Sequence, residues 1–321
     1  MRRHCLFVEI IQNYTSSGQK AAYPVVAIGN FDGVHRGHQA ILKQTVDRAK
    51  AKGGTGIVLT FEPHPLKVLA PAMDLKFLMT LEERLHWIET LGIRQVRLVS
   101  FTHSFANLTP PEFVRNILCN DLGAKEVCVG AQFAFGKERT GTVKDLEALG
   151  EDLGFLVHPV AAVSVAGSPV SSSRIRECLL AGRVAAAKEL LGRAYSLEGQ
   201  IIPGKRRGRA LGYPTANFRP PAELVIPCNG IYAVEAEIKG RILPGVSYIG
   251  TQPTLGSLER MVETHLFEAL PDLYDQFLRV SFVEWIRPEQ TFKDRQELVR
   301  YIEEDIRKAK TILRESLIKY S

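Results

Sequence analysis

The chain has 321 residues, of which 45% are hydrophobic and 24% are charged, a composition that argues against wholesale disorder. At about 100–200 residues per domain, this length predicts two domains or one large domain. No apolar run approaches the roughly 18 residues that a membrane span needs, so no membrane partner is expected. The net charge of +6 permits nucleic-acid binding, but it equally suits a protein that binds phosphorylated small molecules. The five cysteines form no C-x-x-C pair, which argues against a disulfide framework and predicts a cytoplasmic protein.

Strand-like and helix-like segments alternate from about residue 23 to residue 180. Strands are expected at 24–28, 57–61, 95–99, 127–129 and 155–157, and helices at 37–51, 81–91, 111–118, 143–153 and 173–180. This alternation predicts an α/β domain in which helices cover a parallel sheet.

The pattern changes in the second half of the chain, where short runs rich in β-branched residues are separated by Gly and Pro. Strands are expected at 199–202, 231–234, 246–249, 262–267 and 278–283, which predicts a small antiparallel barrel or sandwich. Residues 293–319 have apolar positions at helical spacing and predict a long helix packed on it. We expect the two domains to comprise residues 1–185 and 186–321.

The motif G-x-F-D-x-x-H-x-G-H at 29–38 follows the first strand of the α/β domain and opens a helix. Parallel sheets bind ligands at the carboxyl ends of their strands, and helix N-termini favour phosphate. His35 and His38 are three residues apart, so they share a face of the first helical turn. Two imidazoles there can contact a triphosphate and stabilise charge as pyrophosphate leaves. A zinc site is the alternative, but apart from the distant His64 no third ligand stands at a suitable spacing.

Two shorter segments suit the same site. The first, S-S-S-R-I-R at 171–176, begins a helix, where serine hydroxyls, N–H groups and arginine bind phosphate. An ordinary serine N-cap is the alternative interpretation of this segment. The second, T-F-E-P-H-P at 60–65, follows the second strand, and its alternative interpretation is a proline-rich turn.

These three motifs, in this order, resemble the FAD synthetase nucleotidyltransferases, which transfer AMP from ATP to FMN and release pyrophosphate. The resemblance implies a Rossmann-like nucleotidyltransferase domain. The residues that it implies for ATP are Gly29, Asn30, Phe31, Asp32, His35, His38, Ser172 and Arg176. Those that it implies for the flavin are Phe61, Pro63, His64 and Phe133.

The second half carries its own glycine-rich motif, G-K-x-x-G-R-x-L-G-x-P-T-A-N at 204–217. Such a basic loop can fold N–H groups and cations around phosphates. Thr215 and Asn217 lie two residues apart, so in an extended segment their oxygens face the same way, and such oxygens suit Mg²⁺. Glu263 alternates with apolar neighbours in an expected strand, where a carboxylate can act as general base. A solvated glutamate on the face of a strand is the alternative.

Five motifs of this half resemble riboflavin kinase: 204–217, N-G-I-Y-A-V at 229–234, I-G-T-x-P-T at 249–254, V-E-T-H-L-F at 262–267 and D-L-Y at 272–274. The resemblance implies a six-stranded antiparallel β-barrel followed by a long helix. It implies that Thr215 and Asn217 hold Mg²⁺–ATP and that Glu263 activates the 5′-hydroxyl of riboflavin. The loop residues that it implies for the phosphates are Gly204, Lys205 and Gly208.

The order and separation of the two motif sets match the bifunctional, bacterial-type riboflavin kinase/FAD synthetases. We therefore expect an enzyme that makes FMN from riboflavin and FAD from FMN, with Mg²⁺ as cofactor and ATP as co-substrate. Riboflavin, FMN, FAD and ATP are its expected ligands, no nucleic-acid partner is expected, and the oligomeric state is left open. An RNA-binding regulator that uses the basic cluster at 205–209 is an interpretation from a different class.

Several positions depart from the family pattern. Gln132 stands where an acidic residue is usual, and Ala134 stands where Arg is usual. These two departures motivate a runner-up interpretation, a riboflavin kinase whose N-terminal domain binds nucleotide or flavin without transfer. In the kinase half, Tyr248, Gln252 and Asp275 replace a usual Asn, Arg and Gly, nearer the rims of the pocket than its centre.

Overall fold

The structure, a computed structural model, describes residues 8–12, 21–203, 208, 211–254, 257–268, 270, 273 and 275–318. It divides into two compact units, one up to Ser172 and one from Ser173 on. The expected domain boundary between residues 185 and 186 falls inside α8 (Val184–Leu191), and the extent of each catalytic domain stays a prediction. No helix in the described ranges combines the length and apolar character that a bilayer crossing demands.

The first unit contains a six-stranded parallel sheet with the order β1-β4-β3-β2-β5-β6. Its strands are β1 (Glu9–Gln12), β2 (Pro24–Ile28), β3 (Thr55–Glu62), β4 (Gln95–Ser100), β5 (Glu126–Gly130) and β6 (Leu156–Val160). Its helices are α1 (Arg36–Ala51), α2 (Pro65–Leu69), α3 (Leu81–Thr90), α4 (His103–Ala106), α5 (Pro110–Phe113), the π-helix η1 (Val114–Asp121) and α6 (Val143–Leu153). The predicted alternation is confirmed, and the helix expected at 111–118 is divided between α5 and η1. The elements without a counterpart in the prediction are β1, α2, α4, the 3-10 helix η2 (Lys137–Arg139) and the short hairpin of β7 (Ser164–Val165) and β8 (Ser168–Pro169).

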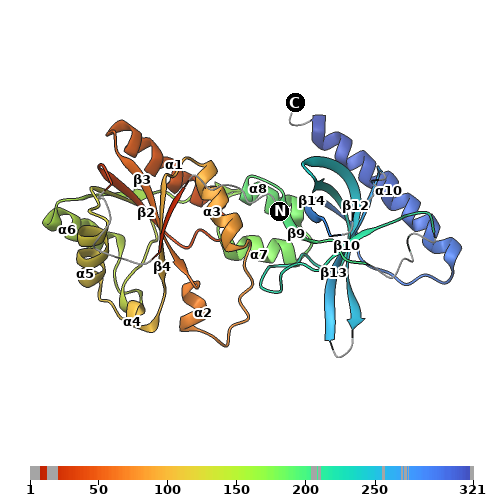
Figure 1. Cartoon of the computed structure of the whole chain (residues 1–321), viewed down its shortest axis with the longest axis horizontal. Helices are drawn as coiled ribbons and strands as arrows, with labels where there is room; N and C mark the ends of the chain where they lie inside the picture. The colour runs from red at the N-terminus through yellow and green to blue at the C-terminus, as the bar shows by residue number, and fades with distance from the viewer. Residues whose placement is uncertain are drawn as a thin grey trace. The chain divides into compact units, whose positions relative to one another are not determined.

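Both faces of this sheet are covered, as Figure 1 shows with α1 and α3 on one side of the strands and α5 and α6 on the other. Val25 and Ala27 of β2 belong to the core that includes residues of α1 and α3. Val26 and Ile28 belong to the opposite core, which includes residues of α5, η1 and α6. A strand buried on both faces requires a continuous apolar run, which is why β2 shows no alternation in its sequence.

The order of the strands reverses at β2. The chain passes from β2 to β3 and β4 on one side, and then returns to β5 and β6 on the other side of β2. The chain therefore leaves the carboxyl ends of the neighbouring strands β2 and β5 in opposite directions along the sheet. Such a switch point is where open parallel sheets bind their ligands.

The second unit contains a six-stranded antiparallel sheet with the order β10-β13-β12-β11-β14-β9. Its strands are β9 (Tyr195–Gln200), β10 (Ala216–Phe218), β11 (Gly230–Ile238), β12 (Arg241–Thr254), β13 (Ser257–Leu266) and β14 (Phe277–Arg287). Just past β9, the N–H of Ile202 donates to the carbonyl of Asn217 in β10 at 2.8 Å, which brings the two edges together. The predicted barrel is confirmed, and β10 is the strand that the prediction lacks.

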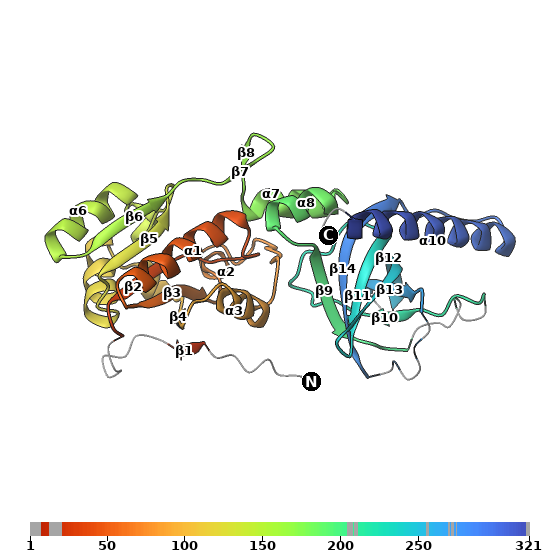
Figure 2. The same cartoon turned by 90° about the horizontal axis from the view of Figure 1, so that it is seen from above.

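The C-terminal helix α10 (Arg295–Ile318) lies along strands of this barrel (Figure 2). Ala309 and Leu313 on α10 share a core with Ala233 and Val283. Arg287 at the end of β14 forms a forked ion pair with the buried Asp305 of α10, with distances of 2.9 Å and 2.7 Å. Packing and charge together hold the predicted long helix on the barrel.

A buried carboxylate anchors the amino end of the parallel sheet, opposite the switch point. Glu126 has no exposed surface and contacts Arg48 of α1, Tyr23 and His158. Burial raises the pKa of Glu126, but the hydrogen bonds from Arg48 and Tyr23 outweigh burial and leave the pKa below its ordinary value. The carboxylate thus joins α1 to β5 and β6.

The substitution Glu126→Gln should destabilise the first unit by about 1–3 kcal/mol, because it removes a charge-assisted hydrogen bond but leaves Arg48 partly in solvent. Because its pKa is lower in the folded state, Glu126 stabilises the fold fully at a pH above the unfolded-state pKa of about 4.3. This stabilisation is lost as the pH falls through the lower folded-state pKa. Urea unfolding between pH 7 and pH 3 should therefore show a flatter acid limb for Glu126→Gln than for the native chain. The exposed Glu151→Gln is the control. Equal acid limbs for all three proteins would contradict the assigned role of Glu126.

Candidate functional site

The motif at 29–38 forms the turn between β2 and α1, and it is tied to three other segments. The buried Asp32 carboxylate accepts the Leu78 N–H at 2.9 Å. The carbonyl of Asp32 accepts the Ser172 hydroxyl at 3.0 Å. The carbonyl of Asn30 accepts a hydrogen bond from Nη1 of Arg84 at 3.0 Å. The expected nucleotide loop is thus held in place at the carboxyl end of β2.

His35 is the N-cap of α1, where its Nδ1 accepts the His38 N–H at 3.3 Å. An Nδ1 that accepts carries no proton, so Nε2 is the ring nitrogen of His35 that carries one. The rings of His35 and His38 stack with centroids 3.6 Å apart and an interplanar angle of 16°. A Cβ at Gly37 would lie 3.2 Å from the His35 ring, so glycine leaves room for this arrangement. The structure brings the two predicted histidines together.

The charge state of this pair follows from its surroundings. Burial, and secondarily the neighbouring His35, lower the pKa of His38 well below its ordinary value, so His38 is neutral at pH 7. The described residues offer no hydrogen-bond partner to its buried Nδ1. A buried nitrogen without a partner is costly until a ligand supplies one, so the pair suits a polar ligand. In the part of the chain that the structure describes, no group of three His, Cys, Asp or Glu side chains could hold a metal, which leaves the zinc alternative without support.

Two of the residues expected at the flavin lie on either side of β2. Phe61 is the next-to-last residue of β3 and Phe133 follows β5, and both are half-buried against the same core. A chain of ring contacts joins them through Phe105, Phe113 and Phe135, with centroid distances of 5.5–6.1 Å. An aromatic border of this kind suits a flat ring system.

The other two residues expected at the flavin lie at the start of α2. His64 is buried and is the N-cap of α2, with Nδ1 accepting the Leu66 N–H at 3.2 Å. Pro63 is exposed. The segment after β3 is therefore ordered by its own helix cap.

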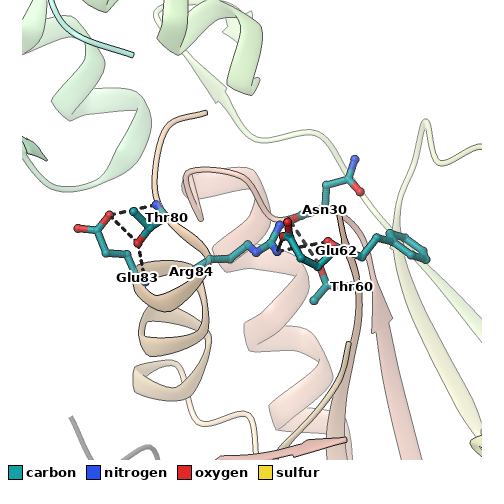
Figure 3. Close-up of polar contacts among 7 residues, drawn as sticks. Asn30, Thr60, Glu62, Thr80, Glu83 and Arg84 are labelled. Atoms are coloured by element: carbon teal, nitrogen blue, oxygen red, sulfur yellow. Dashed lines mark hydrogen bonds and ion pairs between the residues drawn. The ribbon is translucent and has the colours of Figure 1, made fainter. Parts of the chain in front are cut away.

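Arg84 is a residue of this site that the sequence analysis does not single out. It extends from α3 to the ends of β2 and β3, where its guanidinium lies beside Asn30 and Glu62 (Figure 3). Burial lowers the pKa of Arg84, and the charges of Glu62 and Asp32 partly offset this effect. The sequence does hold a signal for Arg84: it is a charged residue four positions before Ile88, and so lies on the apolar face of the expected helix.

Ser172 and Arg176 lie on α7 (Ser172–Leu180), one helical turn apart. Ser172, its first residue, donates to the Asp32 carbonyl as described above, a contact within the first unit. Arg176 is half-buried and belongs to the second unit. The phosphate role of both residues stays a prediction.

In the barrel, two of the residues expected for the kinase reaction, Asn217 and Glu263, share one face of the sheet. Asn217 of β10 and Tyr248 of β12 are the cross-strand neighbours of Glu263 in β13. Directly opposed residues of antiparallel strands point to the same side, with Cβ atoms about 5 Å apart. Val262 and Thr264 are fully buried, so Glu263 points to the opposite side of β13 from the barrel interior. The structure thus brings the expected base next to an expected metal ligand.

The metal ligands expected here differ in burial. Asn217 is buried, and among the described residues nothing hydrogen-bonds its inaccessible Oδ1. Thr215 is exposed and directly precedes β10. An amide oxygen kept from solvent and left without a donor fits a cation ligand.

Two contacts that the sequence analysis does not identify hold the P-T-A-N segment. Nδ1 of His265, two residues beyond Glu263, hydrogen-bonds the Pro214 carbonyl at 2.9 Å. The Tyr213 hydroxyl donates to Glu303 of α10 at 3.2 Å. Alternate residues of a strand point to the same face, so the position of His265 two residues after Glu263 is the signal in the sequence that places it on the face of Glu263.

Of the glycine-rich loop, Gly204 and Lys205 lie outside the described residues, and Gly208 is described. The Gly208 carbonyl accepts the Tyr213 N–H at 2.8 Å. A Cβ at this position would clash with the Tyr213 carbonyl oxygen, so the close approach of two backbone segments requires glycine there.

The departures from the family pattern have modest structural consequences. Gln132 is exposed and Ala134 is half-buried in the loop after β5. Asp275 adopts a φ of 61°, which explains why glycine is usual there and why Asp, which tolerates this conformation, can replace it. Tyr248 donates to Glu289 at 2.9 Å, and burial, together with this hydrogen bond, raises its pKa to about 12. The side chain of Gln252 lies outside the described part of the structure.

Comparison with known proteins identifies both units. The FAD synthetase family model matches residues 18–174, and the riboflavin kinase model matches residues 191–313. The bifunctional riboflavin kinase/FMN adenylyltransferase of Escherichia coli K12 is 35% identical over 296 residues, covering 92% of this chain and 94% of its own. That of Bacillus subtilis 168 is also 35% identical over 296 residues, covering 91% and 93%.

Among solved structures, a macrolide-efflux protein from Streptococcus pneumoniae superposes with a TM-score of 0.86 and 28% identity. The superposition covers 93% of this chain and 97% of that one. The matches to both family models and to bifunctional relatives support two activities, and they do not support the kinase-only alternative. The chain therefore belongs to the bifunctional riboflavin kinase/FMN adenylyltransferases: with ATP, it phosphorylates riboflavin to FMN and adenylylates FMN to FAD with release of pyrophosphate.

Proposed function

We propose that each reaction has its own site within one unit. Adenylyl transfer takes place at the carboxyl ends of β2, β3 and β5, and riboflavin is phosphorylated on the outward face of β10 and β13. The observation that carries the kinase assignment is the register that sets Glu263 opposite Asn217. For adenylyl transfer it is the stacked pair His35 and His38 at the start of α1.

In the adenylylation site, a phosphate oxygen of FMN attacks the α-phosphorus of ATP, and the bond to pyrophosphate breaks. The attacking oxygen is already ionised at neutral pH, so no general base is needed. His35 and His38 donate N–H bonds to the phosphates and stabilise the charge that passes to pyrophosphate. Gly29, Asn30, Phe31, Asp32 and Ser172 complete the proposed ATP contacts within the first unit. Phe61, Pro63, His64 and Phe133 border the flavin.

In the kinase site, the nucleophile is a neutral hydroxyl, which makes a base necessary. Glu263 accepts the proton of the riboflavin 5′-hydroxyl, the oxygen attacks the γ-phosphorus of ATP, and ADP leaves. Gly204, Lys205 and Gly208 form the loop over the phosphates. Because Glu263 and Asn217 belong to paired strands, the base and the phosphate-binding segment keep a constant spacing.

The proposed cofactor is Mg²⁺, and Asn217 and Thr215 are its proposed ligands in the kinase unit. The buried Asn217 Oδ1, for which the described residues provide no donor, supports this assignment. Mg²⁺ bound there would neutralise charge on the ATP phosphates. The cytoplasmic location rests on cysteine usage and stays a prediction.

The substitution Glu263→Gln should lower the rate of FMN formation from riboflavin by about 10²–10⁴-fold, because the amide cannot accept the proton. Adenylylation of supplied FMN by the same protein should be unchanged, which also reports that the chain is folded. Chromatographic separation of the flavins measures both products. The exposed Glu268→Gln, on the segment after β13, is the matched control. FMN formation at the native rate in Glu263→Gln would show that Glu263 is not the base.

The substitution His38→Ala should have the converse effect. We expect FAD formation from FMN to fall by about 10²–10³-fold, the usual loss for one donor to a developing negative charge. FMN formation from riboflavin should be unchanged. His103→Ala removes an exposed histidine from the same unit and should leave both reactions as they are. A native rate of FAD formation in His38→Ala would place adenylyl transfer elsewhere.

The substitution Asn217→Ala should raise the Mg²⁺ concentration needed for half-maximal riboflavin phosphorylation by about 10-fold or more, and Asn217→Asp should restore it by returning an oxygen ligand. The Mg²⁺ dependence of adenylylation in the same protein should be unaffected. A Mg²⁺ titration of each reaction gives the comparison. Identical titration curves for the native and Ala proteins would exclude Asn217 as a ligand.

A further inference from the structure

Arg84 lies at a junction of the first unit that neither reaction accounts for. Its side chain is 7% exposed, although a buried guanidinium is costly unless it is hydrogen-bonded. The acceptors of its Nη1 and Nη2 atoms come from the ends of two neighbouring strands of the parallel sheet, whereas its buried Nε has no hydrogen-bond partner among the described residues. These strands are β2 and β3, which are paired along their length.

The guanidinium forms a fork between the two strand ends. Nη1 donates to the Asn30 carbonyl at 3.0 Å, just after β2. Nη2 donates to the Phe61 carbonyl at 3.3 Å and to the Glu62 carboxylate at 3.0 Å, at the end of β3. A rigid planar fork fixes the separation of its two acceptors, which a flexible ammonium group cannot do.

The helix that carries Arg84 is itself fixed to the nucleotide loop. The first turn of α3 has a capping box in which the Glu83 N–H donates to Thr80 Oγ1 and the Thr80 N–H donates to Glu83, both at 3.2 Å (Figure 3). Two residues before Thr80, the Leu78 N–H is held by Asp32, as described above. The base of the Arg84 side chain therefore cannot shift independently of the loop at 29–38.

We propose that Arg84 is a positioning residue for adenylyl transfer, which sets the spacing between the ATP loop after β2 and the flavin segment after β3. This inference rests on the proposed location of the adenylylation site. Arg84 touches the backbone of both loops and acts through them on the alignment of the two substrates. Each loop can still bind its own substrate without the fork, but the FMN phosphate and the α-phosphorus of ATP no longer meet in line.

The test is Arg84→Lys, which keeps the charge and removes the fork. We expect kcat for FAD formation from FMN to fall by about 10²-fold, as for a misplacement of about 1 Å. Binding of ATP alone and of FMN alone, measured by calorimetry and flavin fluorescence, should be unchanged. Riboflavin phosphorylation by the same chain should also be unchanged.

Arg97→Lys is the matched control. Arg97 is equally buried, lies in β4 of the same unit and pairs with Asp121 at 3.4 Å, away from the two loops. It should lower the thermal midpoint of the first unit without lowering kcat. If Arg84 were merely structural, both variants would lose stability and both would keep the native kcat.

A second variant covers the case in which Arg84→Lys does not fold. Glu62→Gln replaces one partly exposed carboxylate with a neutral acceptor and so weakens its hydrogen bond to Arg84. The unit should fold, and kcat should fall by less than in Arg84→Lys. A native kcat in Glu62→Gln, when Arg84→Lys does not fold, would overturn the proposal.

The outcomes separate the inference from the function on which it rests. If Arg84→Lys keeps its kcat while His38→Ala loses activity, the positioning role is wrong and the site stands. If Arg84→Lys loses the binding of ATP or FMN, Arg84 is a binding residue rather than a positioning residue. If neither substitution affects FAD formation, the proposed location of the site is wrong.

Discussion

The turn after β2 holds two residues other than glycine in the left-handed region of the backbone map, Phe31 at a φ of 54° and Val34 at a φ of 36°. Each such residue costs about 1–3 kcal/mol and persists only where its surroundings determine it. Both side chains are completely buried in the core beneath α1 and α3, and burial of a large apolar side chain recovers a similar amount. The strained turn is what places His35 at the cap of α1 and His38 against its ring.

The two units meet different chemical demands. Transfer to FMN starts from a phosphate that is already ionised, and the proposed site has the imidazoles of His35 and His38 at a helix N-terminus, where an anion is favoured. Transfer to riboflavin starts from a hydroxyl, and the proposed site offers the Glu263 carboxylate on the outward face of a barrel strand. Burial lowers the pKa of His38, which suits a role as hydrogen-bond donor to phosphate. A neutral ring can donate a hydrogen bond without the cost of a buried charge. Under the proposed assignments, a base is thus needed only where the nucleophile is a neutral hydroxyl.

Much of the fold could be predicted from the sequence, because the strong signals are local. The apolar run at 24–28 and the helical spacing at 37–51 correspond to β2 and α1 within a residue. β10 was not recognised as a strand because three residues are too short for a period of two to show. The π-helix Val114–Asp121 has the same apolar spacing as an α-helix at this length, so its wider backbone turn was not predictable.

The sequence alone determined the family to which the chain belongs, because motif residues at constant spacing carry the resemblance without knowledge of distant contacts. Only the tertiary structure decided how these residues are held. The register of β10 against β13 sets Asn217 beside Glu263, 46 positions later in the chain. The Arg84 fork joins loops that follow two different strands. Contacts of this kind depend on how sheets and helices pack, which no local pattern of residues records.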